Sequence, residues 1–267
     1  TGLGESAVIP VWPEDSNMNG SSQERLRKDR GDGHLRVTDV GTPSMLFFPA
    51  PAADGTQPAV ILCPGGGYSY MVVTKMTAIA EWLNNEGIHA FVLKYQTPKK
   101  RTAAFRDAQR AVRVVRSRAA GWMIDPGRIG IMGSSAGGHL AARVSAAPGT
   151  GTYDPIDAVD RASCRPDFAL LLYPAYINKK NTPKLAKEFT VNPDLPPTLI
   201  ISARDDRHHF PSGEVYARTL EEAGASIRTH FFDKGGHGFG LHTEHEPLNT
   251  WPELALKWLT DIHILRP

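Results

Sequence analysis

The chain has 267 residues, a length at which an α/β sandwich is commonly one domain. Hydrophobic residues make up 41% and charged residues 22%, which is ordinary for a soluble globular protein. Its formal net charge of +2 is too small to indicate a nucleic-acid or membrane partner, and no apolar run is long enough to cross a bilayer. The two cysteines, Cys63 and Cys164, lack metal-ligand spacing, and we expect them to be unpaired. The oligomeric state is not readable from the sequence.

Residues 1–33 are rich in Gly, Ser, Asn, Pro and charge, which predicts an irregular N-terminal arm ahead of one domain at residues 34–267. In the domain, short β-branched runs alternate with helical patterns. The predicted strands are 34–40, 45–48, 59–63, 89–95, 128–132, 168–173, 198–203 and 227–232. The predicted helices are 75–86, 103–120, 136–146, 212–223 and 253–264.

This alternation predicts the α/β class, with a mostly parallel sheet and helices on both faces, preceded by two antiparallel strands. Trp251 and Trp258 stand seven residues apart on the last helix, which favours core packing. On the helix at 103–120, small apolar residues form the inner face, so the arginine row is expected to be a solvated face; it comprises Arg106, Arg110, Arg113 and Arg116.

The strongest chemical signal is the G-x-S-x-G segment Gly133-Ser134-Ser135-Ala136-Gly137, which lies between a predicted strand and a predicted helix. This strand–turn–helix setting is typical of a nucleophile elbow, where a strained turn exposes a serine hydroxyl above the sheet. Ser135 is the predicted nucleophile. Ser134 does not fit the spacing, because Met132 rather than glycine stands two residues before it.

A second signal is Pro64-Gly65-Gly66-Gly67-Tyr68, directly after a predicted buried strand. Acyl transfer needs backbone N–H donors aimed at the tetrahedral oxyanion, and a glycine triplet offers them without side chains in the way. The predicted oxyanion hole comprises the amides of Gly66, Gly67 and Ala136.

The base and the acid are predicted at the ends of the last two strands. His237 lies in Gly235-Gly236-His237-Gly238-Phe239, and both Asp205 and Asp206 follow the strand at 198–203. We favour Asp205 as the acid and expect Asp206 to cap a turn or helix. The resulting order of serine, aspartate and histidine is that of the α/β-hydrolases.

This chemistry requires neither a metal nor a cofactor. Two histidine-containing segments deserve comparison with metal motifs, and neither has a zincin spacing. They are the segment from Asp205 to His209 and the segment His242-Thr243-Glu244-His245.

Together, the motifs resemble those of bacterial acetyl-xylan-esterase-like hydrolases, close to the feruloyl-esterase-like and acetyl esterase/lipase groups. The resemblance covers residues 34–263 and rests on the three motifs above, on Lys94-Tyr95, on Asp107-Ala108-Gln109-Arg110-Ala111 and on His139-Leu140-Ala141. It implies a serine carboxylesterase that removes acetyl groups from polysaccharides or oligosaccharides such as xylan. It also favours Asp205 as the acid. Together with the start at Thr1 rather than Met, it predicts a secreted or periplasmic protein.

The segment at 174–197 is short and polar, which predicts an open site without a large lid and hence small acyl groups. Tyr68 and His208 are the predicted substrate-binding residues, and the His208-His209 pair departs from the apolar pair of many relatives. The alternatives are a feruloyl or general short-chain carboxylesterase and a non-catalytic carbohydrate-binding homologue. A prolyl-oligopeptidase-type peptidase would need a large additional domain, for which this chain has no room.

Overall fold

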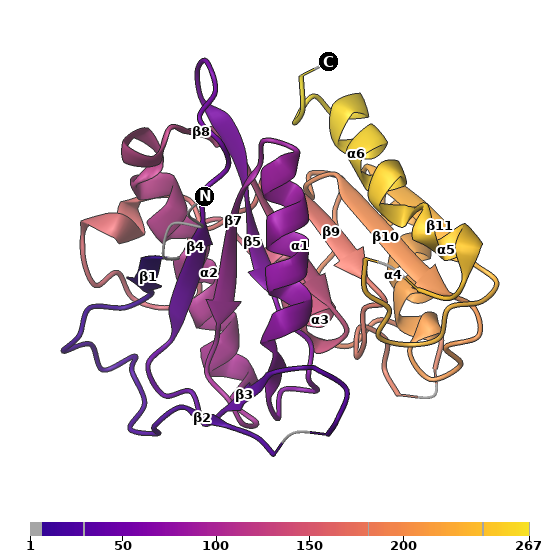
Figure 1. The fold of residues 1–267 in the computed structure, drawn as a ribbon, viewed down its shortest axis with the longest axis horizontal. Coiled ribbons are helices and arrows are strands. Elements are labelled where there is room, and N and C mark those ends of the chain that lie inside the picture. Colours follow the sequence, from indigo (N-terminus) through magenta and orange to yellow (C-terminus); the bar gives the residue numbers. More distant parts are fainter. Residues whose placement is uncertain (1–6, 29, 181, 242, 267) are drawn as a thin grey trace.

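The structure, a computed structural model, describes residues 7–28, 30–180, 182–241 and 243–266. An eight-stranded sheet crosses the molecule in the order β1-β4-β7-β5-β8-β9-β10-β11 (Figure 1). Its strands are β1 (Ala7–Pro10), β4 (Ser44–Phe48), β7 (His89–Lys94), β5 (Gln57–Cys63), β8 (Ile124–Ser134), β9 (Phe168–Leu172), β10 (Thr198–Ala203) and β11 (Ile227–Phe232).

The sheet is antiparallel from β1 to β7 and parallel from β7 to β11. Every residue of β5, β9 and β10 is buried, because helices cover both faces of a mostly parallel sheet. In Figure 1, α1 (Val73–Asn85) and α6 (Trp251–Asp261) lie in front of the sheet, and α2 (Arg101–Ser117), α3 (Ala136–Ser145) and α4 (Phe210–Glu222) lie behind it. The predicted fold class is confirmed.

The arginine row of α2 is not a solvated face. Arg110 and Arg113 are buried and form ion pairs with Asp160, which follows in the short 3₁₀ helix Ala158–Arg161. Arg110 also binds Asp157. The prediction of exposure failed because the two aspartates, 44 to 50 residues further along the chain, neutralise these guanidinium groups inside the protein.

The N-terminal segment is not an irregular arm ahead of the domain. Strand β1 pairs with β4, and the next two residues, Val11 and Trp12, are buried. Trp12 Nε1 donates a hydrogen bond of 2.7 Å to the Asp107 carboxylate on α2. The predicted boundary between residues 33 and 34 is therefore wrong, because this segment completes the sheet edge. Residues 1–6 and 29 of the predicted arm lie outside the described residues.

A second, three-stranded sheet joins β2 (Arg25–Leu26), β3 (Arg36–Thr38) and β6 (Met71–Val72). The predicted strand at 34–40 corresponds to β3, but it pairs with β2 and β6 rather than with β4. Through β3, this small sheet connects β2 of the N-terminal segment to β6, which lies after the loop that follows β5.

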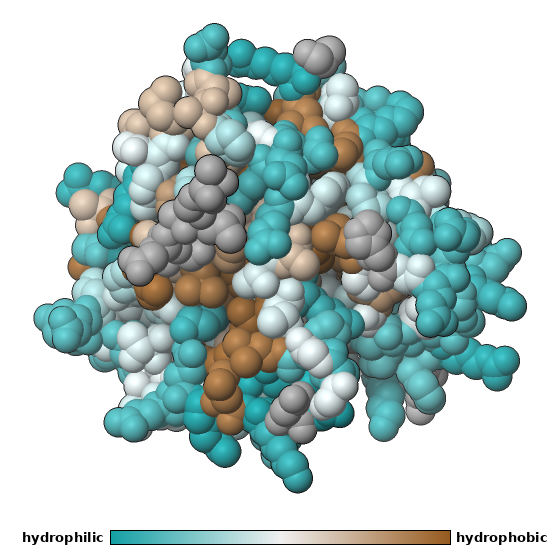
Figure 2. Space-filling model, in the orientation of Figure 1, coloured by the Kyte–Doolittle hydropathy of each residue, from teal (hydrophilic) through white to brown (hydrophobic). Residues whose placement is uncertain are grey.

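The connection at 174–197 contains no helix among its described residues and one isolated bridge, Asn178 to Leu185. No helix in the described ranges is long and apolar enough to cross a membrane. The face in Figure 2 is mostly hydrophilic, with hydrophobic side chains confined to patches. Both cysteines are buried and free, and Trp251 and Trp258 lie in the core, as predicted.

Candidate active site

Ser135 stands in a strained turn between β8 and α3. Its backbone has φ 55° and ψ −118°, a left-handed region that a residue with a side chain rarely adopts. The turn is held on both sides, because Ser135 N donates to Leu172 O and Ser135 O accepts from Ala175 N, each at 3.0 Å. The predicted elbow is therefore present, and it projects the hydroxyl into a pocket.

His237 approaches this hydroxyl from the loop after β11. Its Nε2 lies 2.7 Å from Ser135 Oγ, a hydrogen-bond distance across 102 residues of sequence. The loop is fixed at three points: Tyr173 Oη donates to Phe239 O at 3.0 Å, Lys75 Nζ on α1 donates to Gly238 O, and Gly236 N donates to Asp205 at 2.8 Å. The predicted pairing of Ser135 with His237 is present in the structure.

Asp206, not Asp205, faces the histidine. Asp206 Oδ2 lies 2.5 Å from His237 Nδ1, whereas the carboxylate of Asp205 accepts from the amides of Gly235 and Gly236. The preference for Asp205 is thus corrected, because the turn after β10 buries Asp206 and leaves Asp205 exposed. Asp205 instead supports the backbone of the histidine loop.

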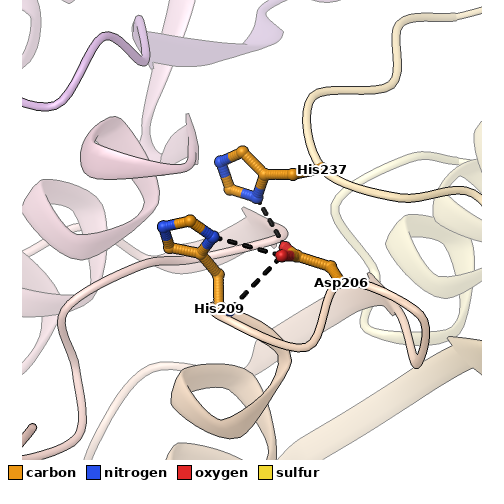
Figure 3. A group of neighbouring side chains, drawn as sticks. All are labelled: Asp206, His209 and His237. Carbon is orange, nitrogen blue, oxygen red and sulfur yellow. Dashed lines mark hydrogen bonds and ion pairs between the residues drawn. The ribbon is translucent and has the colours of Figure 1, made fainter.

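Asp206 is shared between two histidines, as Figure 3 shows. His209 Nδ1 lies 3.1 Å from Asp206 Oδ1, and the His209 ring stacks on His237 with centroids 4.0 Å apart and planes at 28°. Burial alone would raise the pKa of Asp206, but the hydrogen bonds from His209 and His237 hold it well below its usual range. Asp206 is therefore a carboxylate at neutral pH.

Asp206, His209 and His237 are also the residues best placed to hold a metal ion in the described part of the chain, since their ligand atoms lie within 4.8 Å of one another. Each imidazole, however, directs Nδ1 at a different carboxylate oxygen, and the two rings stack. Coordinating imidazoles instead aim their in-plane lone pairs at one point. The geometry fits a hydrogen-bonded network better than a metal centre. His242, part of the other histidine segment, lies outside the described residues.

The glycine loop lies against the elbow. Gly66 and Gly67 line the same pocket as Ser135, and their amides donate to no backbone carbonyl within the described ranges. Their φ values of 139° and 64° explain the need for glycine at both positions. Ala136 begins α3, where backbone amides lack intrahelical acceptors. Free amides therefore flank the nucleophile from two sides.

The pocket at Ser135 has a volume of about 440 Å³ and is walled by three tyrosines. These are Tyr70, Tyr173 and Tyr176, while Tyr68 is absent from the lining. Tyr68 is 2% exposed, and its hydroxyl lies 2.7 Å from His139 Nδ1 beneath the loop. The prediction that Tyr68 contacts substrate is wrong, because its ring is buried and its hydroxyl is hydrogen-bonded to His139 inside the protein.

His208 also lies outside this pocket. It is exposed and lines a neighbouring pocket of about 620 Å³, whereas His209 lines both pockets. The residue that the sequence argument missed is therefore His209. Its position three residues after Asp206, at the entrance of α4, was the available signal, because residues at this spacing meet on one side of a helical turn.

Residues 46–155 match the family BD-FAE. Two curated proteins are also similar to this chain. An acetylxylan esterase of Xylanibacter ruminicola is 32% identical in an alignment that covers 78% of this chain and 46% of that protein. An endo-1,4-beta-xylanase B of Butyrivibrio fibrisolvens is 26% identical over 69% of this chain and 33% of that protein. The chain thus spans less than half the length of these relatives.

Among solved structures, an acetyl ester-xyloside bifunctional hydrolase from Caldicellulosiruptor lactoaceticus has a TM-score of 0.81 and 28% identity, covering 99% of this chain and 100% of that one. An esterase from Thermogutta terrifontis has a TM-score of 0.73 and 22% identity, covering 94% and 98%, and supports the fold alone. With the elbow and its histidine in place, these likenesses support an α/β-hydrolase that is similar to acetyl-xylan-esterase-like proteins.

Proposed function

We propose that this protein is a serine esterase that removes short acyl groups, foremost acetyl, from acetylated xylan or the oligosaccharides cut from it. The observation that carries the proposal is the continuous hydrogen-bonded line from Ser135 Oγ through His237 to Asp206 at an open pocket. The acetylxylan esterase and the acetyl ester-xyloside hydrolase supply the substrate class.

In the proposed reaction, His237 Nε2 takes the proton of Ser135 as Oγ attacks the ester carbonyl. Asp206 holds the imidazole in the required tautomer and stabilises its cation. The amides of Gly66, Gly67 and Ala136 stabilise the oxyanion, where each donor contributes roughly 3–4 kcal/mol. His237 then protonates the leaving alcohol. In the second half of the reaction, His237 takes a proton from the water that attacks the acyl carbonyl, and it returns a proton to Ser135 Oγ as the acid leaves.

The acyl size follows from the pocket. About 440 Å³ of open space, without a helical lid among the described residues of 174–197, suits a small acyl group attached to a large alcohol better than a long alkyl chain. A feruloyl or general short-chain carboxylesterase is the alternative, and a non-catalytic carbohydrate-binding homologue is the second. Substrate choice and the effect of Ser135→Ala separate the three.

The test measures acetate release from acetylated xylan, with p-nitrophenyl acetate, p-nitrophenyl octanoate and a methyl ferulate substrate in parallel. Ser135→Ala is expected to lower kcat by roughly 10⁶-fold. Asp206→Asn is expected to lower it by about 10⁴-fold, because the amide supports the wrong tautomer of His237. Asp205→Asn is the matched control at the neighbouring position, with an expected loss of roughly tenfold through a looser histidine loop.

The outcomes are distinct. Faster turnover of the ferulate ester than of acetylated xylan would select the feruloyl alternative. Full activity of a folded Ser135→Ala protein would overturn the serine mechanism, and a larger loss in Asp205→Asn than in Asp206→Asn would return the acid to Asp205.

A further inference from the structure

A second groove adjoins the pocket of Ser135. It has a volume of about 550 Å³, and Ser69, which lies between the glycine loop and β6, lines both spaces. The groove is lined by Arg25, Arg27, Lys28, Arg30, Thr38, Asp39, Ser69 and Pro98. A sugar unit that leaves the pocket past Ser69 therefore enters a lining rich in cations.

The groove carries excess positive charge. Its described lining residues, which do not include Asp29, hold four cationic side chains and one carboxylate, and that carboxylate, Asp39, is bound by Arg25. Arg27, Lys28 and Arg30 are exposed and form no ion pair within the described ranges, which do not include Asp29. These three cations are available to an anion from solution.

Tyr70 connects the cations to the catalytic pocket. Tyr70 lines the pocket of Ser135, and the guanidinium carbons of Arg27 and Arg30 lie 4.7 Å and 5.3 Å from the centroid of its ring. These cation–π contacts keep two arginines at the mouth of the pocket rather than free in solvent. An anion there would meet side chains that are already positioned.

The small sheet fixes this arrangement in the fold. Strand β2 pairs with β3 (Arg25 opposite Thr38), and β3 pairs with β6 (Val37 opposite Met71), which begins four residues after Gly67 of the glycine loop. Figure 1 shows β2 and β3 side by side at the lower edge of the molecule. The basic segment and the oxyanion loop are thus parts of one hydrogen-bonded unit.

We propose that this groove is a subsite for an anionic sugar residue, so that the preferred substrate is an acylated oligosaccharide bearing a carboxylate or sulfate next to the esterified unit. The inference rests on the proposed esterase function. The planar guanidinium forks of Arg27 and Arg30 match the geometry of both anions, and Lys28 adds a point charge.

The experiment compares acetylated xylo-oligosaccharides of equal length that are neutral, carry a glucuronic acid or carry a sulfate ester. Acetate release gives kcat/KM at about 20 mM and about 500 mM NaCl, across which the screening length falls several-fold. The wild type is expected to favour at least one anionic substrate by roughly fivefold or more at low salt, and the preference is expected to fade at high salt. The two anionic arms identify which anion the groove prefers.

The variant Arg27→Gln with Arg30→Gln is expected to bring the ratio of anionic to neutral kcat/KM close to one. The control, Arg118→Gln with Arg161→Gln, removes the same charge from exposed positions and is expected to keep the ratio. Arg118 follows the far end of α2, about 25 Å along the helix from Arg101, whose guanidinium lies over the pocket residue Tyr176.

Equal kcat/KM for the neutral and both anionic substrates at low salt would overturn the inference and leave the esterase intact. An equal loss of preference in both double variants would also overturn it, because net charge alone would then explain the effect. If the wild type hydrolysed no ester at all, the proposed function would fail and the inference with it.

Discussion

The carboxylate of Asp206 has two imidazole partners, His237 and His209, and each is hydrogen-bonded to a separate carboxylate oxygen. With both oxygens engaged, the carboxylate cannot rotate away from His237. The stacked His209 ring, 4.0 Å from that of His237, restricts the imidazole from one face. His209 is thus a positioning residue, with an effect expected on kcat rather than on KM.

Three substitutions of His209 separate its two contacts. His209→Asn keeps an N–H donor near the Nδ1 position, His209→Phe keeps the ring, and His209→Leu keeps neither. We expect His209→Leu to lower kcat on p-nitrophenyl acetate roughly tenfold with little change in KM, and the other two to lose less. His208→Asn, at the exposed neighbour, serves as the control. A loss in His208→Asn as large as that in His209→Leu would point to a general disturbance of the loop.

The choice between Asp205 and Asp206 as the acid could not be made from the sequence. The spacing after β10 admits both Asp205 and Asp206, and nothing local in the sequence chooses between them. The choice is made by the turn, in which Asp206 N donates to Ala203 O and Asp206 accepts from His209 N. That turn directs Asp206 inward and Asp205 outward. Ser135 and His237 were predictable because glycines flank each of them at a strand end.

At the scale of elements, the elbow depends on close backbone contact between β5, β8 and α3. A Cβ atom at Gly137 would lie 1.9 Å from Cys63 O, and one at Gly133 would lie 2.1 Å from Gly137 O. Both obstacles are backbone atoms, which cannot move aside as a flexible side chain can. The G-x-S-x-G spacing therefore reflects packing as well as the strained turn.

Gly137→Ala is accordingly expected to destabilise the protein by about 3 kcal/mol or more. The higher helix propensity of alanine offsets only about 1 kcal/mol. Thermal unfolding should show a drop in Tm of roughly 6–12 °C, or loss of soluble protein. Gly121→Ala, where an added Cβ meets nothing within 4 Å, should change stability by less than about 0.5 kcal/mol. An unchanged Tm in Gly137→Ala would refute the packing argument.

At the scale of the whole molecule, long-range polar contacts attach peripheral segments to the sheet. Trp12 reaches Asp107 across 95 residues of sequence, and Arg113 reaches Asp160 across 47. Composition described the first segment as irregular and helical periodicity placed the arginine outside. Both expectations failed for the same reason. Composition and periodicity are read from neighbouring residues, and they do not show that Asp107 and Asp160, far along the chain, bind these two side chains. The strands and helices themselves followed from local periodicity, which is why most were predicted near their observed bounds.

The buried cluster of Arg110, Arg113 and Asp160 yields the prediction at this scale. Asp160→Asn leaves Arg113 without its carboxylate partner and Arg110 with Asp157 alone. We expect this substitution to lower the free energy of unfolding by about 3–5 kcal/mol. Urea unfolding at neutral pH measures the loss. Asp261→Asn, which removes a partly exposed partner of Arg228 and Lys257, is the control and should cost less than about 1 kcal/mol.

The acid side of the stability profile tests the same cluster independently. Burial opposes ionisation of Asp160, but its hydrogen bonds from Tyr153 and Ile156 and its pairing with Arg110 lower its pKa, and the hydrogen bond from Arg110 lowers that of Asp157. The stabilisation is therefore complete above the unfolded carboxylate pKa of about 4 and is lost as the pH falls through the lower folded values. Between about pH 5 and pH 2, the wild type should lose more stability than Asp160→Asn. Parallel pH profiles for the two proteins would show that Asp160 is not the source of the acid sensitivity.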